Sequence, residues 1–202
     1  GADTTIPVGD RHTDVDGRNS GVDADDDHFI SLAEGWATIT HRVTATSPSI
    51  ALTAATGVGA SGNPIETTVA NLEASGGTGG VFIANSGDLI IGGVSALVGV
   101  SATGSGINIS VGGSLTINEN VAGTGTNVAL STVDASTAGQ NLILNAGATV
   151  SSTTGSVTLS AGDNATLTGN VSSGTTTTVN IDAGNADAVG GVFSLTGTIT
   201  AP

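Results

Sequence analysis

The chain has 202 residues, and its 17 acidic residues against 3 basic ones give a formal net charge of -14. This balance repels phosphate backbones and anionic lipid surfaces, so we expect no nucleic-acid partner, and no apolar run is long enough to predict a membrane span. Because there is no cysteine, a disulfide scaffold and thiol catalysis are excluded.

The first 47 residues form an acidic segment whose composition differs from the rest of the chain. Residues 1–42 hold nine of the acids, all three arginines and all three histidines. From residue 48 onward the chain is rich in Gly, Ser, Thr and β-branched residues and contains no basic side chain. We therefore expect two parts: an acidic segment over residues 1–47, with a candidate calcium loop and the first strand or strands, and a second region over residues 48–202.

The acidic segment contains a candidate calcium loop that begins at Asp23. Counted from Asp23, carboxylates stand at positions 1, 3, 5 and 12, which is the spacing of the EF-hand calcium loop. Position 6 should be glycine but is His28, and no flanking helices are predicted, so we expect an irregular loop. Its candidate calcium ligands are Asp14, Asp16, Asp23, Asp25, Asp27 and Glu34. The alternative is a solvated acidic loop without a metal.

The region 48–202 repeats short apolar alternations separated by turn-forming residues. Alternation with a period of two predicts strands with one buried face, and Val, Ile, Leu and Thr favour strands. We expect strands at residues 50–52, 81–83, 89–91, 107–111, 115–117, 128–130, 142–144, 157–159, 165–167, 179–181 and 193–195. Turn-formers at residues 112–113, 145–147, 161–163 and 182–184 separate them.

Two all-β architectures suit strands this short. In a β-solenoid each strand stacks on its counterpart one coil later, whereas a β-sandwich or jelly-roll fibre subunit pairs its strands through tight hairpins and fills its core with large aromatics. Asn-Gly and Asp-Gly hairpin signals are nearly missing, and after residue 47 the aromatic residues are Phe82 and Phe193. This composition favours the solenoid, while the uneven strand spacing leaves the sandwich open.

Several phrases in this region resemble the repeats of large bacterial surface adhesins. The stretch Gly57-Val-Gly-Ala-Ser-Gly-Asn-Pro-Ile-Glu-Thr-Thr-Val-Ala-Asn-Leu72 is similar to a recurrent phrase of the filamentous-haemagglutinin-like and autotransporter-type adhesins. Residues 113–117 and 155–162 resemble rungs of the same group, and the resemblance covers about residues 48–200. It implies a secreted, right-handed parallel β-helix at the cell surface that acts as a stalk or filament without catalysis. The acidic segment departs from those repeats.

The sequence therefore predicts a non-catalytic structural component of an extracellular fibre, sheath or adhesin stalk. We expect it to self-associate into a homopolymer or to continue in a larger surface protein. No catalytic residue is predicted, because His12, His28 and His41 lack metalloprotease spacing and no nucleophile elbow is present. The alternative is a surface module that binds glycan or ice through a flat Thr-rich face, formed by residues 175–178 and 196–200.

Overall fold

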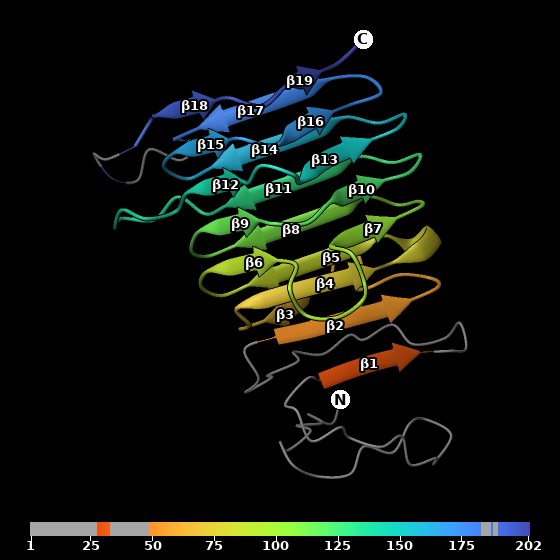
Figure 1. The fold of residues 1–202 in the computed structure, drawn as a ribbon. Coiled ribbons are helices and arrows are strands. Elements are labelled where there is room, and N and C mark those ends of the chain that lie inside the picture. Colours follow the sequence, from red (N-terminus) through yellow and green to blue (C-terminus); the bar gives the residue numbers. More distant parts are fainter. Residues whose placement is uncertain (1–27, 33–48, 183–186, 188–189) are drawn as a thin grey trace.

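The computed structural model describes residues 28–32, 49–182, 187 and 190–202. These residues form an all-β, parallel β-solenoid whose coils stack in chain order (Figure 1). A single 3-10 turn, η1 (Gly77–Gly79), is the only helical element in this part of the chain. The expectation of a solenoid is confirmed, and the sandwich alternative is wrong because every named strand pair is parallel. Among the described residues, no helix is both long and apolar enough to cross a bilayer.

Each regular coil contributes one strand to each of three faces. The first face consists of β6 (Leu89–Ile91), β9 (Leu115–Ile117), β12 (Leu142–Leu144), β15 (Ala165–Leu167) and β18 (Phe193–Leu195). The second face consists of β7 (Val100–Ala102), β10 (Val121–Gly123), β13 (Thr149–Ser152), β16 (Asn170–Ser172) and β19 (Ile199–Thr200). The third face consists of β3 (Ile65–Thr67), β5 (Val81–Asn85), β8 (Ile107–Val111), β11 (Val128–Thr132), β14 (Val157–Ala161) and β17 (Thr177–Ile181).

Three longer strands lie at the N-terminal end of the solenoid. They are β1 (His28–Leu32), β2 (Ser49–Ala54) and β4 (Asn71–Ser75), which pair in parallel in that order. Leu72 of β4 pairs with β6, whereas Ala74 pairs with β7, so one strand of this coil continues as two strands in the next coil. Because β1 belongs to the acidic segment, the sheet includes residues on both sides of the composition boundary.

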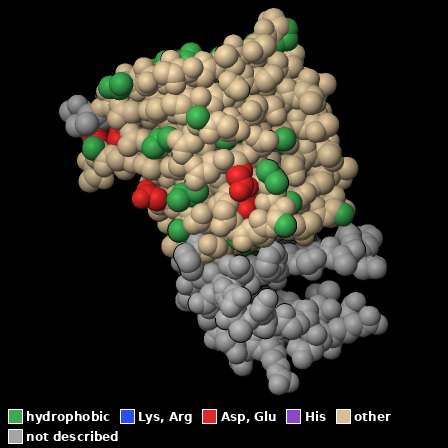
Figure 2. Space-filling view, in the orientation of Figure 1, with side chains coloured by type: hydrophobic (Ala, Val, Ile, Leu, Met, Phe, Trp, Pro, Cys, Tyr) green, Lys and Arg blue, Asp and Glu red, His purple; other side chains and the backbone are tan. Residues whose placement is uncertain are grey.

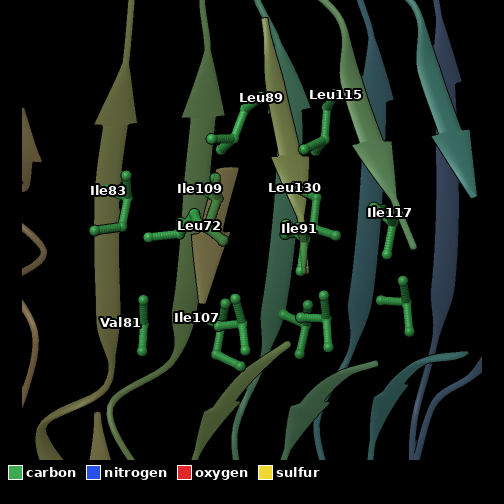
Figure 3. Close-up of a cluster of buried hydrophobic side chains, with 14 of the residues drawn as sticks. Leu72, Val81, Ile83, Leu89, Ile91, Ile107, Ile109, Leu115, Ile117 and Leu130 are labelled. Atoms are coloured by element: carbon green, nitrogen blue, oxygen red, sulfur yellow. The ribbon is translucent and has the colours of Figure 1, made fainter. Parts of the chain in front are cut away.

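The core is a set of apolar columns in which like residues stack in register. On the third face, Ile83 pairs with Ile109 and Ile109 with Leu130 (Figure 3). Leu130 in turn pairs with Leu159. All four side chains are buried, and burial of an aliphatic side chain this size is worth about 1.5–3 kcal/mol. The period-two alternation thus points one set of side chains into a narrow core that needs no large aromatics.

The uneven coil lengths come from insertions at two of the three corners. The corner from the second to the third face always has four residues, at 103–106, 124–127, 153–156 and 173–176. The other two corners carry the longer insertions, as in the loops 92–99 and 133–141 and in the chain between the end of β17 and the start of β18. The strands therefore keep a constant register while the loops between them vary, which explains the irregular spacing in the sequence.

The outer surface of the solenoid is formed mainly by small uncharged groups. Figure 2 shows a surface dominated by polar side chains and backbone, with few carboxylates and scattered apolar side chains. Residues 43–202 contain no lysine or arginine. This part of the chain therefore supplies no lysine or arginine of its own to pair with its carboxylates.

Candidate functional site

The six candidate calcium ligands, Asp14, Asp16, Asp23, Asp25, Asp27 and Glu34, lie outside the described residues. The described part of that stretch is β1, an extended strand that pairs with β2. Among the described residues, no group of three or more His, Cys, Asp and Glu side chains is placed to hold a metal ion. The calcium loop of the acidic segment stays a prediction.

The last coil exposes side chains of the kind that every earlier coil buries. Within the described residues it ends the stack, and its large apolar side chains are partly open to solvent: Val192 (61 %), Phe193 (42 %), Leu195 (43 %) and Ile199 (36 %). We call these four residues the C-terminal end surface. The in-register neighbours of three of them, one coil below, are at most 1 % exposed: Ala165 under Phe193, Leu167 under Leu195 and Val171 under Ile199.

Strand edges accompany this apolar surface. In the described part of the chain, β17, β18 and β19 each pair with a strand of the preceding coil and with none beyond it. Their outer backbone groups are thus unpaired with any strand, and such edges are templates for further strand pairing. The apolar side chains and the strand edges together make this end suited to continue the stack.

A column of polar side chains at one corner links successive coils. The column consists of the residues that directly precede the first-face strands. Asp88 Oδ1 accepts the N–H of Ser114 at 2.8 Å, and Ser114 Oγ accepts the N–H of Asn141 at 3.2 Å. Asn164 Nδ2 donates to Asn141 Oδ1 at 2.9 Å, and its own Oδ1 accepts the N–H of Val192 at 3.0 Å. Polar groups at the corner therefore continue the pairing that the strands begin.

Side-chain hydrogen bonds also link successive coils at the other two corners. In each case an asparagine Oδ1 accepts the backbone N–H of its counterpart one coil later. The pairs are Asn120 with Thr149 at 2.9 Å, Asn127 with Ser156 at 2.9 Å, and Asn170 with Thr198 at 3.1 Å. These asparagines satisfy backbone donors where the chain turns out of the strand ladder.

Two glutamates hold the loop 92–99 on the side of the solenoid. Glu73 is fully buried, and its carboxylate accepts the N–H groups of Val94 at 2.8 Å and Ser95 at 2.9 Å, together with the Ser95 hydroxyl. Glu119 accepts N–H groups from the two ends of the same loop, at 3.1 and 2.7 Å. Hydrogen bonds from several backbone donors replace the water that the buried Glu73 carboxylate has lost.

A shallow groove of about 600 Å³ lies beside the third face. It is lined by Glu66, Thr67, Thr68, Ala84, Asn85, Ser86, Gly87, Ser110, Gly112 and Val133. The Asn85 side chain accepts from Thr67 and Val69 and donates to the carbonyls of Gly87 and Asp88, so it serves the fold. The carboxylate and hydroxyl groups of the lining could hydrogen-bond a polar ligand.

Threonines do not form a long ladder on the described faces. Thr178 pairs with Thr158, but the next position down that column is Ala129. Thr200 pairs with Ser172 on the second face. Within the expected Thr-rich surface for a glycan- or ice-binding module, the paired positions are thus Thr178 with Thr158 on the third face and Thr200 with Ser172 on the second.

The chain matches no family model, no curated protein and no solved structure. The likeness to bacterial adhesins accordingly remains a resemblance in residue pattern. The β-solenoid itself stands on the parallel register of the strands.

Proposed function

We propose that this chain is a structural, non-catalytic element of an extracellular fibre, sheath or adhesin stalk, and that its copies associate through the C-terminal end surface. The observation that carries the proposal is the exposure of Phe193, Leu195 and Ile199, which continue columns that are buried in the coils below. A further coil on this surface, from a second copy or from more of a larger surface protein, would bury these apolar side chains and pair the strand edges.

The mechanism of such a role is mechanical. Parallel strands, in-register apolar columns and polar corner bonds all link each coil to its neighbours along one axis. A second copy stacked on this axis would extend the same columns, and burial of each large apolar side chain would contribute about 1.5–3 kcal/mol before the cost of association. The rod would lengthen without a new type of contact.

Sedimentation velocity over a range of protein concentrations tests the proposal. We expect the wild-type chain to form larger species as its concentration rises. Leu195→Asp should abolish this increase, because association would bury the new charge, while the exposed position should tolerate it in the single chain. Val98→Asp is the matched control: Val98 is 63 % exposed but lies in the loop 92–99 on the side of the rod.

The two variants distinguish association through the end surface from association through the side of the rod. Association that survives in Val98→Asp and disappears in Leu195→Asp supports stacking through the end surface, provided that circular dichroism shows intact β structure. A wild-type chain that sediments as a monomer at every concentration, in calcium and in chelator, would overturn the proposal. Dependence on calcium would in addition show that a bound cation contributes to association, and the six carboxylates of the acidic segment are the candidate ligands expected from the sequence.

A further inference from the structure

Two coils carry side chains at a corner position where their neighbours have glycine. Two residues before each first-face strand, the chain reads Gly87, Gly113, Gln140, Asp163 and Gly191. Backbone bonds connect this column: Gly113 N–H to Gly87 O at 3.0 Å, Asp163 N–H to Gln140 O at 3.0 Å, and Gly191 N–H to Asp163 O at 3.2 Å. Gln140 and Asp163 therefore lie directly above one another in adjacent coils.

Space for these side chains comes from the long loop 133–141. A Cβ at Gly113 would stand 2.3 Å from Asp88 Oδ1, so that corner admits only glycine. At the longer corner both side chains fit and are covered: Asp163 is 1 % exposed and Gln140 is 7 % exposed. Gly190 of the next coil lies close to the Asp163 backbone, since a Cβ there would lie 3.0 Å from the Asp163 Cα.

The buried pair presents two oxygens without donors. Asp163 Oδ2 accepts the N–H groups of Gly139 at 2.5 Å and Gln140 at 3.0 Å. Within the described part of the chain, Asp163 Oδ1 and Gln140 Oε1 are buried and have no hydrogen-bond partner. An unmade hydrogen bond to a buried polar group costs about 1–3 kcal/mol, and more for a charged one. Glu73, the other fully buried carboxylate of the residues that the structure describes, differs in that three donors contact it.

Neighbouring coils offer Asp163 no basic side chain. Residues 43–202 contain no lysine or arginine. A carboxylate oxygen and an amide oxygen are ligands that hard cations such as Ca²⁺ select.

We propose that the corner between Gln140 and Asp163 binds a hard cation, with Asp163 Oδ1 and Gln140 Oε1 as its side-chain ligands and Ca²⁺ as the probe. The site consists of one carboxylate and one amide oxygen at the contact of two coils, and it uses none of the six candidate ligands of the acidic segment. Bound there, the cation would fasten the loop 133–141 to the following coil.

Calcium binding must be measured without interference from the acidic segment. The background is therefore the full chain with Asp14, Asp16, Asp23, Asp25 and Asp27 changed to Asn and Glu34 changed to Gln. In this background, equilibrium dialysis with Ca²⁺ should show one bound ion, and the unfolding temperature should be higher in Ca²⁺ than in chelator. Asp163→Asn should abolish both effects.

The substitution is chosen so that the variant still folds. The amide introduced by Asp163→Asn keeps an oxygen for the N–H groups of Gly139 and Gln140 and removes the uncompensated charge, so in chelator this variant should be at least as stable as the background. Asp88→Asn is the control, because Asp88 is exposed and caps the N–H of Ser114 at another coil; it should retain the bound ion. Absence of a bound ion in the background chain, or equal binding by Asp163→Asn, would overturn the proposal.

Discussion

Asn127 Oδ1 accepts the backbone N–H of Ser156, one coil further along the chain, at 2.9 Å, and the Ser156 hydroxyl at 3.2 Å. Equivalent bonds from Asn120 and Asn170 occur on the second face. These bonds show that the corners, and not only the strands, are held by contacts between consecutive coils.

Asn127→Ala should lower the free energy of unfolding by about 0.5–1.5 kcal/mol, because the N–H of Ser156 loses its partner at an exposed corner where water replaces it in part. Asn127→Asp keeps an acceptor oxygen and should lower the free energy of unfolding by less. Urea unfolding measures both changes. Asn108→Ala is the control, since Asn108 is exposed on β8 and makes no side-chain hydrogen bond within the described residues; an equal loss in this variant would contradict the role of the corner bond.

Leu130→Ala should lower the free energy of unfolding by about 2–5 kcal/mol, one of the largest effects expected for a single substitution. Leu130 is buried between Ile109 and Leu159, and the rigid strands on both sides prevent the column from closing the cavity. Chemical unfolding gives the value, and Val98→Ala, at an exposed position, should change it by less than about 0.5 kcal/mol. A loss at Leu130 of under about 1 kcal/mol would mean that the core repacks freely.

Glu73→Ala should release the loop 92–99 from the side of the rod. The substitution leaves the N–H groups of Val94 and Ser95 without their acceptor, at a cost of about 1–3 kcal/mol. Hydrogen exchange at these two amides should accelerate, while amides of β11 keep their protection. Glu66→Ala, at an exposed position of β3, should leave the exchange of both amides unchanged; unaltered protection in Glu73→Ala would show that other contacts hold the loop.

Gly99→Ala should lower the unfolding temperature more than Gly93→Ala. Both glycines have positive φ, +61° at Gly99 and +76° at Gly93. Alanine in the left-handed region costs about 1–2 kcal/mol. At Gly93 the added Cβ meets its nearest atom at 3.6 Å, whereas at Gly99 it would stand 2.1 Å from the Asn120 carbonyl oxygen. The difference in unfolding temperature between the two variants measures the effect of the steric clash. Equal decreases would show that the backbone at Gly99 shifts to relieve the clash.

The eleven strands expected from the sequence all lie within observed strands, and they belong to the first face, the third face and β2. The second face could not be predicted. Its strands β7 and β10 carry a single large apolar residue each, Val100 and Val121, beside Ser, Ala or Gly. A period-two pattern needs two apolar positions, so a strand that fills a narrow corner of the core leaves no alternation to detect.

Some of the polar contacts could have been predicted from the sequence. Asn or Asp directly before an apolar run, as in Asn127-Val128 and Asp88-Leu89, is a signal that could have predicted the corner bonds. Glu73 was not predictable, because on β4 it reads as an outward-facing strand residue, and only the fold of the loop 92–99 over it explains its burial. Asp163 reads as part of an ordinary turn, since its burial depends on distant insertions.

The strand pairs join residues about one coil apart in the sequence, and this spacing affects both folding and unfolding. Since each strand pairs only with its counterparts in adjacent coils, every added coil closes a chain segment of similar length, and the entropic penalty per coil does not grow with the height of the stack. Folding can then propagate like a zipper, and damage to one coil weakens its immediate neighbours while distant ones persist.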